Sequence, residues 1–231
     1  MPSLYEVRHD EPCSPHGYTV PREGKDAPTV VYKRVVEDFG ATNPLSQSCV
    51  PYAQLVHDRL SIEILRGCAR GCRFCQAGMV YRPTREKDVE RLKKLAYQML
   101  KSTGHEEISL SSLSSSDYSQ LQELVTFLIE EFKGKGVNIS LPSLRIDAFS
   151  LDVMGKVQDI KKSSLTFAPE AGSQRLRDVI NKGLTKEVIL EGAGMAFEGG
   201  WNKVKLYFML GLPTETEEDL SLIHISEPTR H

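Results

Sequence analysis

Strand-like and helix-like segments alternate from about Leu60 onward, and this alternation limits the possible folds more than any other feature of the sequence. Runs of strand character lie at 61–65, 107–113, 137–141, 165–168 and 203–210. Alternation of this kind is typical of βαβ units around a parallel sheet. We therefore predict an α/β fold, closed either as a doubly wound sheet or as a barrel-like array. In both, function lies on the loops at the carboxyl ends of the strands.

The helices between these strands are predicted from apolar stripes and capping residues. Residues 86–101 carry one such stripe. Ser116 or Asp117 is the expected N-cap of the next helix. Its stripe comprises Leu121, Leu124, Val125, Leu128, Ile129 and Phe132. Thr185 is expected to cap a later helix, and Thr214-x-x-Glu217 is the pattern of a capping box that opens the last one.

The two ends of the chain depart from this alternation. Residues 1–59 are rich in proline and predict an extended connector, interrupted by one strand-like run at Thr29–Val36. At the other end, Ser221–His231 reads SLIHISEPTRH, and Pro228 arrives before an amphipathic face is completed. This stretch resembles a translated sequencing adapter. We expect a core over 60–220, followed by a non-native or disordered tail over 221–231.

Composition excludes several classes of protein. Apolar residues make up 40% of the 231 residues, which is enough for a core, and the net charge of −2 gives no general attraction to nucleic acid or membrane. No apolar run is long enough to span a bilayer, and the N-terminus has no secretory apolar region. The number of cysteines is odd, and three of the five fall within eight residues. That pattern favours a metal site in a reducing cytoplasm over a disulfide framework.

The clustered cysteines form a C-x3-C-x2-C motif, Cys68, Cys72 and Cys75, on a glycine-flanked loop directly after the first strand of the core. Thiolates hold iron–sulfur clusters, and a cubane normally takes four ligands. No fourth ligand lies nearby in the sequence. Three ligands favour a cluster with one iron open to a substrate or cofactor. The alternative is a structural zinc completed by a distant residue, such as Cys49 or Cys13.

Five arginines lie in and around this loop, which admits two interpretations. They are Arg66, Arg70, Arg73, Arg82 and Arg85. They could bind an anionic substrate or an RNA backbone. We favour compensation of an anionic cluster, because the aromatic interleaving of a nucleic-acid platform is missing.

The cysteine motif, with Phe74 before its last cysteine, resembles the radical S-adenosylmethionine (SAM) superfamily, and the similarity covers about residues 60–220. Ser109–Ser114 occupies the place of the family's motif for the SAM amino group, and Phe167–Ser173 resembles its fourth-strand E-x-G-S motif. Phe208–Thr216 resembles its fifth-strand G-x-P-x-E-T motif. The motifs that look most like the subgroup whose radical SAM domain follows a cobalamin-binding domain are Arg66-Gly67-Cys68, Phe74–Gly78 and Tyr81-Arg82-Pro83.

The resemblance implies a partial (β/α)6 barrel of the TIM type, truncated here after about five βα units, and a [4Fe–4S] cluster held by Cys68, Cys72 and Cys75. SAM would chelate the open iron and be cleaved reductively to a 5′-deoxyadenosyl radical that abstracts a substrate hydrogen. The residues it implies in SAM binding are Phe74 and Gly211 at the adenine, Ser112 and Ser114 at the amino group, Ser143 and Arg145 at the carboxylate side, and Glu170 at the ribose or amino group.

The resemblance also implies a reducing partner such as flavodoxin or ferredoxin, a small-molecule or macromolecular substrate, and cobalamin in a longer parent protein. We expect a fragment, because neither a cobalamin-binding domain before residue 60 nor a sixth strand is present. One alternative is a methylthiotransferase acting on RNA or a ribosomal protein, which would need a preceding domain with a second set of cysteines. The other is a non-catalytic zinc or iron–sulfur binding module, which leaves the E-x-G-S and fifth-strand motifs unexplained.

Overall fold

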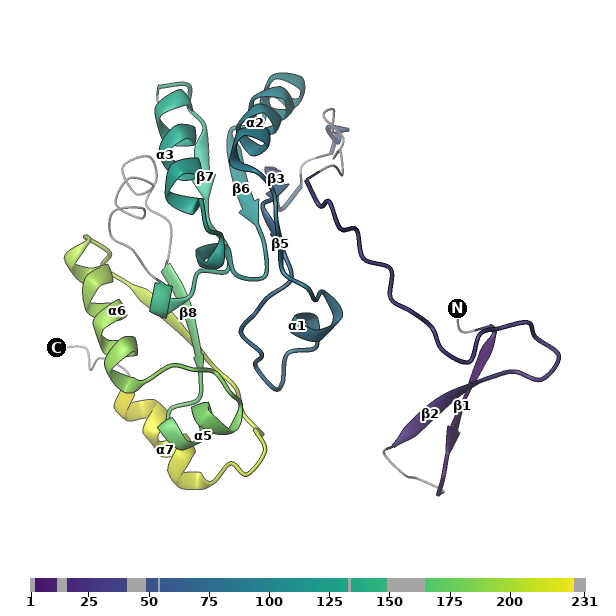
Figure 1. Ribbon diagram of the computed structural model, residues 1–231. Coiled ribbons are helices and arrows are strands. Elements are labelled where there is room, and N and C mark those ends of the chain that lie inside the picture. The colour runs from purple at the N-terminus through teal and green to yellow at the C-terminus, as the bar shows by residue number, and fades with distance from the viewer. Residues whose placement is uncertain are drawn as a thin grey trace. The chain divides into compact units, whose positions relative to one another are not determined.

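A computed structural model describes residues 3–11, 16–40, 49–53, 55–132, 134–148 and 165–226. The chain divides into two compact units, Met1–Asp38 and Phe39–His231. In the first unit, strands β1 (Tyr5–His9) and β2 (Gly17–Pro21) pair as an antiparallel hairpin (Figure 1).

The predicted strand at Thr29–Val36 is wrong. These residues form no strand, and the side chains of Val30, Val31 and Tyr32 are exposed. A strand needs a neighbour to pair its N–H and C=O groups, and none of the described residues supplies one here. The hairpin that does form was missed, although Tyr5 and Val7 on one strand and Tyr18 and Val20 on the other alternate as strand residues should.

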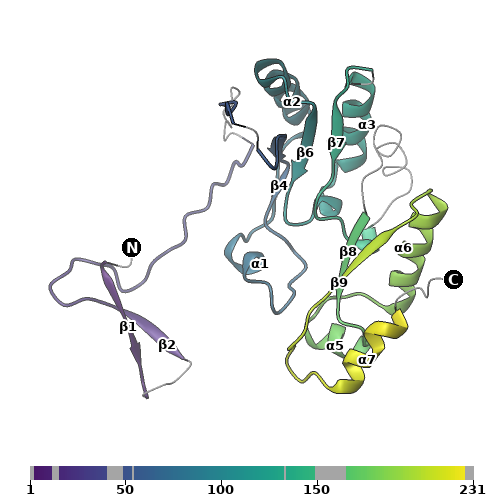
Figure 2. The same cartoon turned by 180° about the vertical axis from the view of Figure 1, so that it is seen from behind.

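In the second unit, three parallel strands form a sheet in the order β3-β6-β7, namely β3 (Leu60–Glu63), β6 (Glu107–Ser111) and β7 (Asn138–Ser140). The helices α2 (Val89–Thr103) and α3 (Leu121–Phe132) lie side by side on this sheet (Figures 1 and 2). These parallel connections are the predicted βαβ units. Among the described residues, no helix has the length and apolar content needed to cross a membrane.

The predicted apolar stripes form the core between these helices and the sheet. In α3, Leu124, Val125 and Leu128 are at most 1% exposed, and Ile108 and Leu110 of β6 are equally buried. Each such side chain contributes about 1.5–3 kcal/mol relative to leaving it in water. This burial fixes the sheet and so the positions of its carboxyl ends.

A second parallel pair consists of β8 (Leu165–Glu170) and β9 (Val204–Phe208). Helices α5 (Gln174–Val179) and α6 (Lys186–Glu198) connect them. Thr185 caps α6 as predicted, accepting a hydrogen bond from the Val188 N–H. All five predicted core strands are therefore present, and they pair in parallel within each of the two sheets, which confirms the α/β fold of a partial barrel. The described strands do not close it, since β7 and β8 are not paired.

Two predicted caps lie elsewhere. Ser116 and Asp117 sit in a 3-10 turn, η1 (Ser115–Asp117), and α3 begins only at Leu121. The capping box of α7 (Glu217–Ser226) is Thr216-x-x-Asp219, two residues later than predicted. The Thr216 N–H donates to Asp219 Oδ2 at 3.0 Å and the Asp219 N–H donates to Thr216 Oγ1 at 3.4 Å. Thr214 and Thr216 each have an acidic residue three positions later, so the sequence offers two capping boxes. Ser173 and Arg175 also bind the Asp219 carboxylate, and these contacts favour the box at Thr216.

Helix α7 also runs past the predicted end of the core at residue 220, because it continues to Ser226. A Cβ atom on Gly172 would lie 2.7 Å from the backbone nitrogen of Ile223 and 2.8 Å from the carbonyl carbon of Leu222. The helix therefore packs its own backbone against Gly172. Residues 221–226 are therefore helical, 227–231 lie outside the described residues, and the non-native origin of 221–231 stays a prediction.

Candidate functional site

The loop Gly67–Cys75, here called the Cys loop, leaves the short strand β4 (Leu65–Arg66) and ends at helix α1 (Gln76–Val80). It lies at the carboxyl end of β3, where the predicted site belongs (Figure 1). Gly67 has a φ of 92°, and a Cβ there would lie 2.7 Å from the carbonyl oxygen of Tyr81 and 2.8 Å from that of Pro83. Only glycine fits this approach, so the start of the loop is fixed.

The three cysteines of the loop are free thiols and half-buried. Cys75 caps α1, because its Sγ accepts from the Gly78 N–H at 3.4 Å, and its own N–H donates to the Cys72 carbonyl at 3.0 Å. Three accessible thiols on one loop are the donor set that iron–sulfur clusters use. Within the described ranges, no three His, Cys, Asp or Glu side chains converge on a single-ion site. Cys49 is exposed, and Cys13 lies outside the described residues.

The serines after β6 lie in a compact turn at the same edge of the sheet. Ser112 Oγ lies 3.0 Å from Ser115 Oγ and accepts from the Ser114 N–H at 3.1 Å. Ser115 Oγ contacts the Pro142 carbonyl at 2.7 Å, which ties this turn to the segment after β7. Ser114 is 2% exposed, and its Oγ has no hydrogen-bond partner within the usual distance and angle limits, although it contributes to the lowered pKa of Asp117. A buried hydroxyl without a partner is costly and is a reason to look for a ligand group.

A pocket of about 370 Å³ opens between the Cys loop and the end of β6. Its lining residues are Glu63, Leu65, Arg66, Gly67, Tyr81, Ser111, Ser112 and Leu113. Arg66 donates to both carboxylate oxygens of Glu63, at 2.8 and 2.6 Å. The volume falls in the usual range for small-molecule sites.

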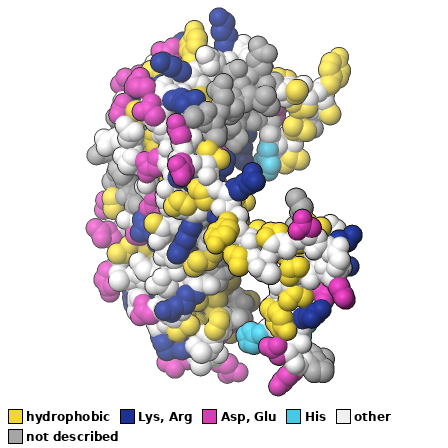
Figure 3. Space-filling view, turned by 45° about the vertical axis from the view of Figure 1, so that its right-hand side comes forward, with side chains coloured by type: hydrophobic (Ala, Val, Ile, Leu, Met, Phe, Trp, Pro, Cys, Tyr) yellow, Lys and Arg dark blue, Asp and Glu magenta, His cyan; other side chains and the backbone are white. Residues whose placement is uncertain are grey.

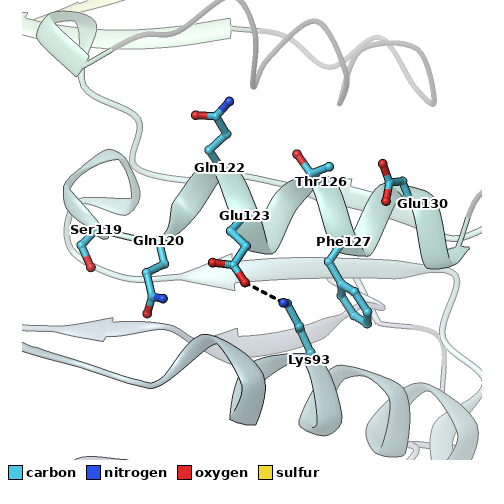
Figure 4. A pocket seen from close by; sticks show the side chains of 8 residues that line it. All are labelled: Lys93, Ser119, Gln120, Gln122, Glu123, Thr126, Phe127 and Glu130. Carbon is cyan, nitrogen blue, oxygen red and sulfur yellow. Dashed lines mark hydrogen bonds and ion pairs between the residues drawn. The ribbon is translucent and has the colours of Figure 1, made fainter.

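A larger hollow of about 710 Å³ lies along α3 and the turn before it, and Lys93 is the lining residue from α2 (Figure 4). Its lining is mostly polar, and Lys93 points across it to Glu123 at 2.7 Å. It shares no lining residue with the pocket beside the Cys loop. The hollow therefore adds nothing to the predicted site.

Glu170 ends β8 with a φ of 70°, in the left-handed region that a residue with a side chain rarely adopts. Its Oε1 lies 3.1 Å from Lys182 Nζ, and both side chains are largely buried. The same ammonium lies 5.8 Å from the centre of the Phe74 ring. Lys182 thus connects two predicted SAM-binding residues that are far apart in the sequence.

Arg145 is held in a network of charges at the end of β7. Its Nε and Nη2 donate to the two oxygens of Asp147, at 2.9 and 3.0 Å. Arg70 of the Cys loop donates to Asp147 at 3.2 Å and also forms an ion pair with Asp117. Burial is the largest single influence on Asp117 and opposes its ionisation, but several favourable contacts, led by the hydrogen bond from Arg70, together outweigh it and lower the pKa of this carboxyl. The carboxylate that Arg145 binds in this structure is Asp147.

Ser143 and Gly211 also follow strands, and both have left-handed backbones, with φ values of 62° and 80°. The Gly211 N–H donates to Glu215 Oε2 at 2.7 Å. With Glu170 and Thr214, Ser143 belongs to a group of strained non-glycine residues near the ends of strands. Such strain costs about 1–3 kcal/mol per residue and tends to concentrate at functional sites.

Most arginines around the Cys loop form ion pairs or hydrogen bonds with other residues of this chain. Arg66 and Arg70 bind carboxylates, whereas Arg73 and Arg85 donate to backbone carbonyls. In the space-filling view, basic and acidic side chains are interspersed over the face that is shown (Figure 3). These contacts favour stabilisation of the loop over binding of an RNA backbone.

Several residues of this site were not predicted. Lys182 and Asp147 have no motif of their own, and each is recognised only by its contact, with Glu170 and Arg70 respectively. Asn181 had one signal, since Asn-x-Gly is a turn pattern in which asparagine tolerates a left-handed backbone. Its φ is 54°.

Comparison with known proteins adds an independent result. The family model described as the radical SAM superfamily matches residues 62–224. The chain is 41% identical over 170 residues to an uncharacterized protein of Methanocaldococcus jannaschii, covering 73% of this chain and 37% of that protein. It is 26% identical over 209 residues to a protein of the same organism that is provisionally named a methylthiotransferase, covering 87% and 46%. The chain thus spans less than half the length of these relatives.

Two solved structures share the fold at low sequence identity. The methyltransferase TsrM from Kitasatospora setae, a radical SAM enzyme, has a TM-score of 0.55 at 14% identity, covering 73% of this chain and 33% of that one. OxsB, described as a cobalamin-dependent SAM radical enzyme, has a TM-score of 0.57 at 17% identity, covering 71% and 25%. At these identities the likeness concerns the fold alone.

Proposed function

This chain belongs to the radical SAM superfamily, a family of enzymes, and we propose that its Cys loop holds a [4Fe–4S] cluster at which SAM is cleaved reductively. The observation that carries the proposal is the position of the C-x3-C-x2-C loop. Its three free thiols lie at the carboxyl edge of a parallel sheet, beside a pocket of about 370 Å³. Carboxyl edges are where α/β folds of this kind place their chemistry.

The residues around the loop fit such a site. When bound, the cluster would supply the electron that breaks a C–S bond of SAM and leaves a 5′-deoxyadenosyl radical. Cys68, Cys72 and Cys75 are the proposed ligands. The buried Ser114 hydroxyl lacks a partner and, with Ser112, is suited to bind the SAM amino group.

The other proposed contacts need rearrangements of different size. Phe74 is 40% exposed, and the Lys182 ammonium lies 5.8 Å from the centre of its ring. Glu170 must share its carboxylate with Lys182, and Arg145 must exchange Asp147 for the SAM carboxylate. Ser143 and Gly211 are proposed to offer backbone groups, although the Gly211 N–H now binds Glu215. Arg145 is therefore the weakest of these assignments.

The test is anaerobic reconstitution of the chain with iron and sulfide. We expect about four irons and four sulfides per chain, as a cubane requires. Addition of SAM should change the electron paramagnetic resonance (EPR) spectrum of the reduced cluster, and dithionite should then yield 5′-deoxyadenosine. Binding of zinc without sulfide would contradict the proposal and favour the non-catalytic module.

The reaction that follows radical formation has two candidates. Similarity to the protein provisionally named a methylthiotransferase favours transfer of a methylthio group to RNA or a ribosomal protein. The shared fold of TsrM and OxsB is consistent with a cobalamin-dependent reaction of the full-length protein. Mass spectrometry separates them, because methylthio transfer adds both sulfur and carbon to the substrate. In either case we propose an external one-electron donor, such as flavodoxin or ferredoxin.

A further inference from the structure

The last residues of helix α5 and the turn after it, Asp178–Gly183 (together called the α5 turn), are hydrogen-bonded to the Cys loop. The Arg73 N–H donates to the Ile180 carbonyl at 2.9 Å. The Arg73 guanidinium donates to the carbonyls of Val179 at 2.5 Å and Asp178 at 3.2 Å. Asp178 and Val179 belong to the last turn of α5 and Ile180 is its C-cap, and the carbonyls at such a helix end carry negative partial charge. A cation is the group that such an end binds best.

A second contact runs in the opposite direction. Asn181 Nδ2 donates to the Gly71 carbonyl at 2.9 Å. Both residues have left-handed backbones, with φ values of 54° and 68°. The two contacts meet the Cys loop at Gly71 and Arg73, the residues on either side of Cys72.

The α5 turn is itself held firmly, so it can act as a fixed support. Arg177 is 2% exposed, and its guanidinium donates to the carbonyls of Leu184 at 2.8 Å, Ala171 at 3.0 Å and Gly172 at 2.8 Å. Lys182 is tied to Glu170 as described above. The support therefore connects the end of β8 to the backbone around the middle cysteine.

We propose that Arg73 and Asn181 are positioning residues, which hold the backbone on both sides of Cys72 in the conformation that accepts the cluster. The proposal rests on the proposed function, since it assumes that Cys72 binds iron. Neither side chain is a ligand. Both act through the loop, so their loss should loosen a bound cluster rather than remove a donor atom.

Three variants test this in the full chain. Arg73→Gln removes the charge and the fork of donors, whereas Arg73→Lys keeps the charge. Asn181→Asp keeps the size and the tolerance of a left-handed backbone, but it places an acceptor against the Gly71 carbonyl. Arg91→Gln and Asn202→Asp are matched controls, because both residues are exposed and lie outside the loop and the turn. The measurements are the rate of iron release to a chelator, the EPR spectrum of the reduced cluster, and the melting temperature of the cluster-free chain.

We expect Arg73→Gln and Asn181→Asp each to release iron about two- to tenfold faster than wild type, the range expected for one lost hydrogen bond. Their EPR spectra should also change, and Arg73→Lys should recover part of both effects. The controls should behave as wild type. If Arg73→Gln lowers the melting temperature of the cluster-free chain severely, the test rests on iron release and the EPR spectrum of Asn181→Asp.

Wild-type iron release and an unchanged EPR spectrum in Asn181→Asp and Arg73→Gln would overturn the positioning role and leave the proposed function intact. A wild-type chain that takes up no cluster would instead overturn the proposed function, and this inference with it.

Discussion

Ser173 Oγ donates a 2.5 Å hydrogen bond to Oδ1 of Asp219, a residue forty-six positions further along the chain. Ser173 is also the N-cap of α5, and Asp219 completes the capping box of α7. Arg175 forms an ion pair with the same carboxylate. The segments after β8 and β9, which carry two of the sequence motifs, are thus joined at one buried carboxylate. Ser173 of the E-x-G-S motif therefore has a structural role, capping α5 and binding Asp219, that does not depend on SAM.

Asp219→Asn should therefore lower the melting temperature at pH 7 by a few degrees. The hydrogen bonds from Arg175 and then Ser173 lower the pKa of Asp219 well below its usual range. A carboxyl with a lowered folded-state pKa stabilises the protein above its unfolded pKa of about 3.9, and this stabilisation is lost as the pH falls further. Thermal melts from pH 7 to 3 should show the difference between wild type and variant narrowing below about pH 4. A constant difference across this range would contradict the role of the charge, and Glu191→Gln on the exposed face of α6 is the control.

Replacing Cys68, Cys72 or Cys75 by alanine should abolish the cluster, because a cubane cannot be held by two thiolates and no other cysteine lies nearby in the sequence. Cys49→Ala is the control, since this cysteine is exposed and outside the Cys loop. Iron and sulfide analysis after anaerobic reconstitution measures the outcome. Loss of the cluster in Cys49→Ala would show that the ligand set is wrong.

Gly67→Ala should prevent assembly of the cluster even though all three cysteines remain. The added methyl group would lie within 2.8 Å of two carbonyl oxygens, and the φ of 92° is unfavourable for alanine. The loop must then move away from Tyr81 and Pro83. Gly134→Ala is a matched control, because its φ is 78° but a Cβ there meets nothing within 4 Å. Equal iron contents in the two variants would remove the case for a fixed loop.

The sequence predicted the core strands and the cysteine loop, but it could not predict how the loops meet. Hydrophobic periodicity and helix capping depend on residues a few positions apart. The apolar stripe of α3 and the Thr185 cap could therefore be predicted from the sequence. The partnership of Glu170 with Lys182 depends on the course of α5 and its turn. The choice of Thr216 over Thr214 depends on Asp219, whose position is fixed by Ser173 and Arg175 at the start of α5. The prediction of a strand at Thr29–Val36 is wrong for the opposite reason. Its local pattern is that of a strand, but no described strand pairs with it.

Glu170→Gln should weaken SAM binding while leaving the cluster intact. The variant keeps the shape of the side chain but loses the charge that pairs with Lys182 and would accept from SAM. Loss of a hydrogen bond to a charged group costs about 1.5–3 kcal/mol, so the Kd for SAM should rise roughly tenfold or more. Titration of SAM followed by EPR gives the Kd, and the iron content gives the control. An unchanged Kd for SAM would contradict the assignment of Glu170 as a SAM-binding residue.

Truncation after Leu220 should destabilise the chain, whereas truncation after Ser226 should not. The first deletion removes Leu222 and Ile223, whose backbone covers Gly172, and it cuts α7 after its first turn. The capping box at Thr216 and Asp219 would then have almost no helix to cap. Uncovering the E-x-G-S segment should lower the melting temperature by several degrees, and SAM binding should weaken with it, because Gly172 and Ser173 directly follow Glu170 and Ala171. Equal melting temperatures for both truncations would mean that residues 221–226 contribute no structure to the folded chain, as their sequence alone predicts.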